Sequence, residues 1–459
     1  MSIKRNIVYI FSVAFLHVAC KKMIEIPQPS DQLIDAVVFT DNRSAESAIV
    51  GLYSEMMRSN NTLSSGAISV LPSMTADEVN YNSTNSGLLE FYQNAISVNN
   101  SNNQSIWKSG YSYLYQANAI INGLTRSTNL SDTIKNQLTG EAKFMRALIY
   151  YYLINIYGDV PMVIGTDYTT NAQLPRQSKA DICNLMITDL KQAKQLLPTS
   201  LLGGKRTRPN SAAASFLLAR FYLLTNAWGL AETEATEVIN NTNYSLLPQL
   251  SDVFLAGSKE AIFQLQPVNP SLNTYEGNTF IPASATVIPP YTLTNDLFNL
   301  FSTTDKRKSN WIKTNTVGSN NYNYPFKYKV RIATTVTESS MIFRLAEMYL
   351  TRAEARMELN KISGVGGALE DLNTIRRRAG VPDINGLDIS QTKAAIEAES
   401  RLELFCEWGH RWITLKRTGR VDAVLTAIKA SAWQSTDSLF PIPQTEIDRN
   451  GLLLQNPGY

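Results

Sequence analysis

Aromatic residues within polar stretches suggest a sugar-binding chemistry for this chain. A tyrosine or tryptophan ring stacks on the apolar face of a pyranose, while nearby Asn, Asp or Arg side chains bond its hydroxyls. Two polar segments, at about 59–104 and 241–337, carry such rings, and Trp311, flanked by Asn310 and Lys313, is our first choice for glycan contact. The other candidates are Tyr81, Tyr92, Tyr275, Tyr291 and Tyr322. For each ring, the alternative is that it anchors its loop to the frame.

Carboxylates are the second group with possible chemistry. Glu399, Glu403 and Glu407 recur at helical spacing, close to Arg401 and Arg411. A glycoside hydrolase needs two carboxyl groups that converge on one bond. Because basic residues are interspersed here, we expect ion pairs between helices instead. We predict no catalytic residue.

Composition excludes several other classes of function. The 459 residues carry a formal net charge of +3 with no long basic run, so nucleic acid is not an expected partner. The chain has two histidines, His17 and His410, and His17 lies in a segment that we expect to be removed. A site with several histidine ligands is therefore excluded, and we predict neither a metal ion nor a cofactor.

The stretch from Gly140 to Pro161 is the most apolar helical run and predicts a buried spine. Almost every residue from Phe144 to Tyr157 is apolar or aromatic, so other helices should enclose it. Gly158 and Pro161 are typical helix-ending residues. Helical periodicity also recurs at about 45–58, 105–124, 178–197, 211–225, 229–240, 341–360, 367–378 and 391–408.

Paired helices joined by short turns predict a mainly α fold of tetratricopeptide-like antiparallel pairs. We expect a single compound domain over residues 41–459. The segments at about 59–104 and 241–337 are its loop-rich excursions, with a few short strands, among them 261–266 and 327–332.

The N-terminus reads as an export signal followed by a lipidated cysteine. Residues 1–19 combine a basic start with an apolar core, and Cys20 follows Ala19 directly. We predict cleavage before Cys20, acylation of its thiol, and a tether over residues 20–40; the alternative is a plain secretory signal. Cys183 and Cys406 form either a disulfide or two buried free thiols.

Several motifs stand out when the chain is taken in order. The spine carries Gly140-Glu141-Ala142-Lys143-Phe144, Arg146-Ala147 and Gly158-Asp159-Val160-Pro161. Later motifs are Arg208, Ala212-Ala213-Ala214, Arg344-Leu345-Ala346-Glu347, Arg376-Arg377-Arg378-Ala379-Gly380, Gly409, Arg411-Trp412, and the ending Gln455-Asn456-Pro457-Gly458-Tyr459. Together, and in this order, they resemble the motifs of the SusD/RagB family of outer-membrane nutrient-binding lipoproteins of the Bacteroidetes.

The resemblance implies a lipid-anchored protein of the outer membrane that faces the cell exterior. It also implies a SusC-like TonB-dependent transporter as partner, to which the protein delivers captured oligosaccharide. We therefore predict a non-catalytic glycan-binding protein. Two alternatives remain open: a peptide-binding partner of such a transporter, and a helical glycoside hydrolase.

Overall fold

Helix α7 (Asp132–Tyr157) is the spine of the computed structural model, which describes residues 38–459. Ser131 stands at its N-cap, and Gly158, with a φ of 76°, ends it in a conformation that suits glycine. From Leu138 to Tyr157 nearly every side chain is buried, which confirms the predicted spine. The predicted signal peptide and the lipidation of Cys20 lie outside the described residues.

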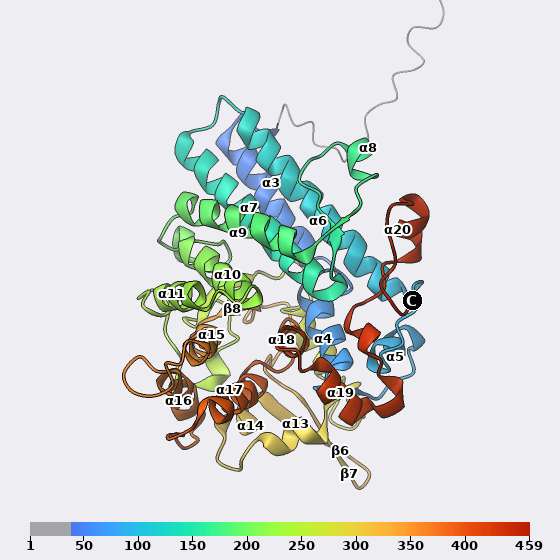
Figure 1. Ribbon diagram of the computed structural model, residues 1–459, viewed down its shortest axis with the longest axis vertical. Coiled ribbons are helices and arrows are strands. Elements are labelled where there is room, and N and C mark those ends of the chain that lie inside the picture. Colours follow the sequence, from blue (N-terminus) through green and yellow to red (C-terminus); the bar gives the residue numbers. More distant parts are fainter. Residues whose placement is uncertain (1–37) are drawn as a thin grey trace, which may run out of the picture.

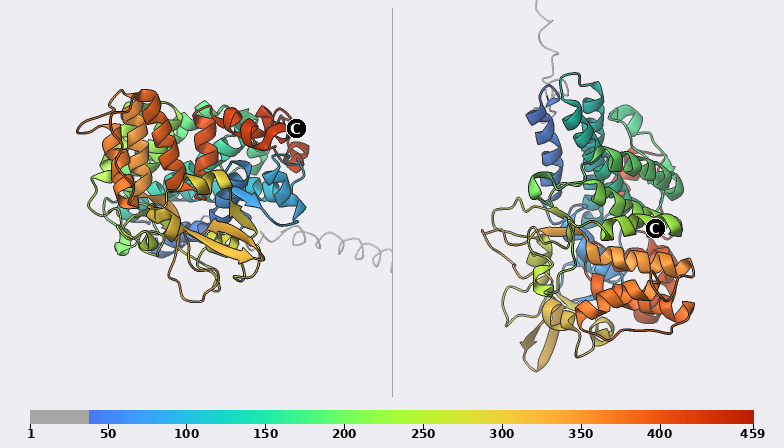
Figure 2. Two further views of the ribbon diagram at one scale, coloured as in Figure 1. Left: turned by 90° about the horizontal axis from the view of Figure 1, so that it is seen from below. Right: turned by 90° about the vertical axis from the view of Figure 1, so that its left-hand side faces the viewer.

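The long helices stack in sequence order, each against its neighbours. α6 packs on α7, then follow α9, α10, α11, α15, α16 and α17. Figure 1 shows α7, α9, α10, α11, α15 and α16 descending along one side, and the right-hand view of Figure 2 shows them as successive layers. The bounds are α3 (Asn42–Met56), α6 (Ser101–Arg126), α9 (Lys179–Leu196), α10 (Ser211–Leu224), α11 (Trp228–Ile239), α15 (Leu345–Glu358), α16 (Ala368–Ala379) and α17 (Ile389–Leu404). The prediction of a mainly α fold of stacked helix pairs is confirmed.

Local sequence explains where these helices begin and end. Ser178 accepts a hydrogen bond from the Asp181 backbone at the start of α9, as the sequence predicted. Asp388 and Gln391 form a capping box at the start of α17. Gly380 ends α16 in the left-handed conformation, with a φ of 75°.

The first excursion is more ordered than predicted. It contains α4 (Ser65–Thr75), β1 (Val79–Tyr81) and α5 (Ser86–Tyr92). The loop prediction failed at α4 because it followed the average composition of residues 59–104, whereas this stretch alone is largely apolar and buried. Its polar groups find partners inside the protein: Ser73 Oγ donates to Ser69 O at 2.6 Å and to Glu78 Oε2 at 2.8 Å.

The second excursion mixes short helices and strands. Its helices are α12 (Tyr275–Phe280), α13 (Asn295–Leu300) and α14 (Lys306–Trp311), and its strands are β4 (Ala261–Leu265), β5 (Tyr291–Leu293), β6 (Ile312–Val317) and β7 (Asn320–Pro325). β4 confirms the predicted strand at 261–266 and pairs with β8 (Ser340–Arg344). The strand predicted at 327–332 is wrong. There the backbone N–H groups of Lys329 and Val330 donate to the Glu338 carboxylate instead of to a neighbouring strand.

Shorter elements complete the described chain. They are β2 (Val160–Pro161), β3 (Arg176–Gln177), α8 (Tyr168–Asn171), α18 (His410–Arg417), α19 (Val421–Lys429) and α20 (Gln444–Arg449). Arg176 Nη1 donates to Leu454 O at 2.7 Å, and Asn456 Nδ2 donates to Tyr157 O at 2.9 Å. The C-terminal motif Gln455-Asn456-Pro457-Gly458-Tyr459 thus lies against the end of the spine helix.

Candidate functional site

The two excursions meet at a short sheet. β1 and β5 pair antiparallel, so that Asn80 lies opposite Thr292 and Tyr81 opposite Tyr291. Asn82 extends the contact, because its Nδ2 donates to Pro289 O and Thr292 Oγ1, both at 3.0 Å. Asn82 and Pro289 are 207 residues apart in the chain. Two polar segments that the sequence treats separately therefore form one surface.

The hairpin of β6 and β7 joins the same surface. Asn315, which is 2% exposed, donates through Nδ2 to Ser284 O and Val287 O at 3.0 Å each. We call residues 80–92, 281–292 and 312–325 together the loop junction. The left-hand view of Figure 2 shows its blue and yellow segments side by side.

Hydroxyl and amide groups dominate the exposed part of the loop junction. Residues 82–86 and 283–288 are exposed. On the outer face of the hairpin, Thr314 Oγ1 donates to Asn323 Oδ1 at 2.7 Å and Thr316 Oγ1 donates to Asn321 Oδ1 at 2.8 Å. Such groups both donate and accept hydrogen bonds, as sugar hydroxyls do.

Two of the predicted rings are accessible at the loop junction. Tyr92 is half-buried, and its hydroxyl donates to Asn80 Oδ1 at 3.4 Å. Tyr322 is half-buried and lies opposite Asn315 in the hairpin. Glycan contact by Tyr92 and Tyr322 remains a prediction.

Three other predicted rings are buried. Tyr81, Tyr291 and Tyr275 are 8%, 5% and 7% exposed. The rings of Tyr81 and Tyr291 pack with their centroids 5.3 Å apart, and the Tyr275 hydroxyl donates to Arg58 O at 2.7 Å. These rings anchor the excursions to the frame, which was the alternative to glycan contact.

The structure contradicts the prediction for Trp311. Its side chain has no exposed surface, and its Nε1 donates to Leu250 O at 2.9 Å. The Lys327 ammonium lies 4.8 Å and the Arg344 guanidinium 5.6 Å from its ring centroid. A ring enclosed by protein cations cannot stack on a sugar, so Trp311 is a core residue.

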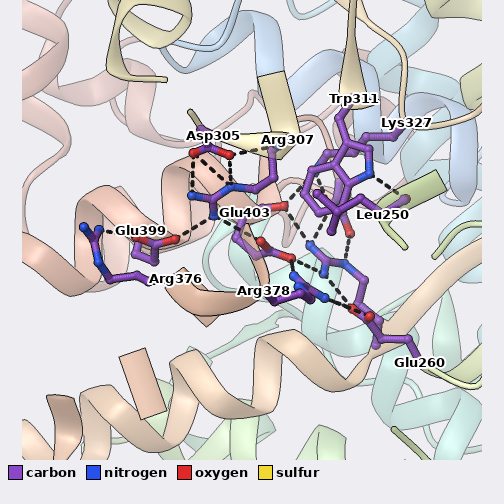
Figure 3. A network of polar contacts seen from close by, with 12 residues as sticks. Leu250, Glu260, Asp305, Arg307, Trp311, Lys327, Arg376, Arg378, Glu399 and Glu403 are labelled. Atoms are coloured by element: carbon purple, nitrogen blue, oxygen red, sulfur yellow. Dashed lines mark hydrogen bonds and ion pairs between the residues drawn. The ribbon is translucent and has the colours of Figure 1, made fainter. Parts of the chain in front are cut away.

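Behind Trp311 lies a dense set of buried charges, which we call the ion-pair network (Figure 3). Arg307 pairs with Asp305 at 2.8 Å and with Glu399 at 2.7 Å, and Arg344 pairs with Glu403 at 2.6 Å and with Glu407 at 2.7 Å. The remaining members are Glu260, Lys327, Arg376 and Arg378. The expectation of ion pairs at Glu399, Glu403 and Glu407 is confirmed.

The arginines of the network hold Glu403 in its charged form. Burial alone disfavours the charge of Glu403, but Arg378, Arg344 and Arg307 more than offset this and keep its pKa below the usual range. A glycosidase acid needs a raised pKa, so Glu403 does not suit that role.

Two other buried carboxyl groups behave oppositely. Burial raises the pKa of Glu78 and of Glu276 to about 7. Glu276 accepts hydrogen bonds from Ser340 Oγ at 2.8 Å and Ser69 Oγ at 3.5 Å, so its partners are hydroxyl groups and not arginines. Each side chain is only 1% exposed, so a glycosidic bond cannot reach either carboxyl group.

The remaining reactive side chains are occupied or buried. His410 Nε2 lies 3.1 Å from Glu347 Oε2 and 3.0 Å from Arg220 Nη2. Cys183 and Cys406 are buried free thiols, which decides against the disulfide between them.

Within residues 38–459 no group of three or more His, Cys, Asp or Glu side chains is placed to hold a metal ion. Over the same range no helix combines the length and the apolar character that crossing a membrane requires.

Sequence reasoning missed the polar residues that assemble the loop junction. Asn82 and Asn315 connect its segments by hydrogen bonds. The outer face of its hairpin carries Thr314, Thr316, Asn321 and Asn323. A signal was present, because Thr and Asn recur at every second position on either side of the turn at Gly318. That alternation is typical of a hairpin with one face in solvent.

Two family profiles match this chain. The profile of the SusD family matches residues 273–459, and the profile described as "Starch-binding associating with outer membrane" matches residues 28–223. SusD-like protein P25 of Formosa agariphila is 24% identical, with 100% of each chain covered. A SusD-like protein of Bacteroides ovatus is 24% identical, with 89% of this chain and 81% of the relative covered.

Solved structures share the fold. A SusD superfamily protein from Bacteroides vulgatus matches with a TM-score of 0.80 at 21% identity, covering 92% of this chain and 100% of that one. Surface glycan-binding protein A from Bacteroides thetaiotaomicron, solved in complex with laminarihexaose, matches with a TM-score of 0.76 at 20% identity, covering 91% and 100%. Because two SusD-type profiles match successive parts of the chain and its relatives along the whole sequence are SusD-like proteins, the chain belongs to the SusD/RagB family.

Proposed function

We propose that this protein is a non-catalytic carbohydrate-binding lipoprotein of the outer membrane. It captures oligosaccharide at the loop junction and delivers it to a SusC-like TonB-dependent transporter. The observation that carries the proposal is the meeting of two polar, ring-bearing excursions in one exposed surface on a SusD-type frame. The match to a starch-binding, outer-membrane-associated family and a structural neighbour solved with laminarihexaose support the same function.

The chemistry of the loop junction suits this role. Half-buried Tyr92 and Tyr322 offer ring surface, and the hydroxyl and amide row of the hairpin offers hydrogen bonds. Solvent-exposed contacts of this kind bind moderately, because each replaces a hydrogen bond to water. Moderate affinity suits a protein that must release its cargo to a transporter.

A binding assay coupled to a turnover assay tests the proposal. Purified protein is applied to an array of neutral and acidic oligosaccharides, and the strongest glycan is then incubated with the protein while new reducing ends are measured. We expect retention of at least one glycan without products. Turnover would show an enzyme, whereas retention of peptides but of no glycan would favour the peptide-binding alternative.

Variants locate the site. Tyr92→Ala and Tyr322→Ala should each weaken glycan binding, and the matched control is Tyr168→Ala, whose ring on α8 is 80% exposed outside the loop junction. Equal affinity of all three variants would place the glycan elsewhere. Anchoring is tested separately, because Cys20→Ser should abolish incorporation of labelled fatty acid and release the protein from the membrane fraction.

A further inference from the structure

We propose that the loop junction selects uncharged oligosaccharides over acidic ones such as uronate or sulfated chains; this rests on the proposed function. Charged residues make up 18% of the whole chain. In residues 80–92, 281–292 and 312–325, however, the charged side chains are Glu90 and Lys313 alone. One charge from outside these segments is close: the Lys429 ammonium lies 5.5 Å from the centroid of the Tyr92 ring, but it is half-buried and donates to Met74 O at 2.7 Å and Tyr92 O at 2.9 Å. Segments this poor in charge, in a chain of ordinary composition, point to a ligand that carries none.

Neither of the two charges is placed as an anion-binding group. The Glu90 carboxylate accepts from Ser97 N at 2.9 Å and from Asn100 Nδ2 at 2.6 Å, so it orders its own segment. The Lys313 ammonium lies 4.9 Å from the centroid of the Phe326 ring. The Lys329 ammonium lies 4.3 Å from the same ring, but it is half-buried and donates to the carbonyl oxygens of Asn310 and Phe326. An exposed lysine such as Lys313 is screened by salt and contributes little to binding.

Acidic sugars need partners that the loop junction does not offer. A carboxylate or sulfate that leaves water must be repaid by charge-assisted hydrogen bonds, and the paired donors of arginine do this best. The three segments contain no arginine. Among the arginines nearest in sequence to the hairpin, Arg307 and Arg344 lie in the ion-pair network. Arg331 is half-buried and its Nε is enclosed by protein atoms, so this nitrogen is not presented to a ligand.

Uncharged sugars find complementary groups here. Each sugar hydroxyl both donates and accepts, and so do the hydroxyl and amide groups of the hairpin. Val287 and Ile288 are 40% and 44% exposed, so they add apolar surface for the C–H face of a ring. The desolvation cost of a neutral chain is small compared with that of an anion.

Salt dependence separates the two classes of ligand. The strongest neutral and the strongest acidic oligosaccharide from the array are titrated into the purified protein by calorimetry at low and at high sodium chloride. We expect the acidic chain to bind at least about tenfold more weakly, and we expect the neutral affinity to change less than about twofold with salt, because no ion pair forms. If an acidic chain binds most tightly and its affinity falls with salt, the proposed selection of uncharged chains is overturned, while the proposed function of glycan binding remains. If no glycan binds, the proposed function fails as well.

A designed charge sharpens the test. Thr316 is exposed on the outer face of the hairpin, so Thr316→Arg should narrow the gap between acidic and neutral chains by about threefold or more, as one charge-assisted contact allows. The matched control is Thr233→Arg, an exposed threonine on α11 outside the loop junction, which should leave the gap unchanged. If both arginine variants change the gap in affinity between acidic and neutral chains equally, the proposal is overturned. It is also overturned if Thr316→Arg leaves this gap unchanged and Tyr322→Ala leaves the affinity for neutral chains unchanged.

Discussion

The ion-pair network and the loop junction both draw on the second excursion, yet they use charge in opposite ways. In the network, Arg307, Arg344 and Glu403 are at most 1% exposed and surround one another. At the loop junction, exposed Asn, Ser and Thr groups stand almost without charge. Buried ions add stability only when each is paired, whereas solvated neutral groups can exchange partners freely. On the proposed function, the difference separates a region that stabilises the frame from a region that binds and releases ligand.

Removing one network carboxylate should give the largest effect. Glu403 contacts Arg307, Arg344 and Arg378, so Glu403→Gln leaves three buried guanidinium groups short of charge. We expect a loss of about 5 kcal/mol in the free energy of unfolding, measured by denaturant titration. The control Glu358→Gln breaks the exposed pair with Lys393 and should cost less than about 1 kcal/mol. Similar losses of unfolding free energy for both variants would mean that burial does not determine how much an ion pair contributes to stability.

Trp311→Ala should come next. It removes a fully buried ring and the hydrogen bond to Leu250 O, so we expect a loss of about 3 to 4 kcal/mol in stability. Trp311→Phe keeps most of the volume and should cost less. If the Trp311→Ala protein keeps the melting temperature of the wild type but loses glycan affinity, Trp311 belongs to the binding surface and not to the core.

Buried carboxyl groups with and without arginine partners should respond to pH in opposite directions. The pKa of Glu276 is raised by burial to about 7, so its contribution to stability is complete below its unfolded pKa of 4.5 and is lost as the pH rises through 7. Glu276→Gln should therefore gain stability relative to the wild type at pH 8, and this gain should shrink toward pH 5. Melting temperatures across this range measure the effect, and a constant difference would contradict it.

Glu347 provides the opposite case. Burial disfavours its charge, but Arg220 and His410 more than offset this and lower its pKa to about 2. Its contribution is present above pH 4.5 and is lost as the pH falls toward 2. Glu347→Gln should therefore differ most from the wild type at neutral pH and least in acid. A difference that grows in acid would contradict the pairing.

The smallest effect on stability is expected at the loop junction. Tyr322→Ala removes a half-buried ring from a hairpin exposed to solvent, so the free energy of unfolding should change by no more than about 0.5 kcal/mol. Glycan affinity should fall by about tenfold, as the loss of one stacked ring suggests. Stability that falls together with affinity would show that Tyr322 anchors the hairpin as Tyr291 anchors β5.

Periodicity predicted the frame well because the long helices owe their form to local patterns. α9 begins and ends near the predicted residues, and α7 ends where Gly158 predicted, since Ser178 and Gly158 are local cap signals. Trp311 was misassigned because its sequence neighbours are polar, whereas the groups that enclose it, Lys327 and Arg344, come from later in the chain.

The assembly of the loop junction could not be predicted for the same reason. β1 and β5 have three residues each, which is too few for a periodic signal in the sequence. They pair although β1 lies in the first excursion and β5 in the second. Long-range pairing depends on the frame that brings the strands together, which local propensity does not encode.

The hydrogen bonds that join the segments of the loop junction also limit how its ligand specificity can change. Asn82 holds the 281–292 segment, and Asn315 holds the same segment from the other side. A 281–292 segment transplanted from a relative would lose partners in both other segments, and a transplanted 80–92 or 312–325 segment would lose its partners in 281–292. Preferences should therefore be exchanged as a matched set of three segments, because a graft of residues 80–92, 281–292 and 312–325 together keeps the contacts among them.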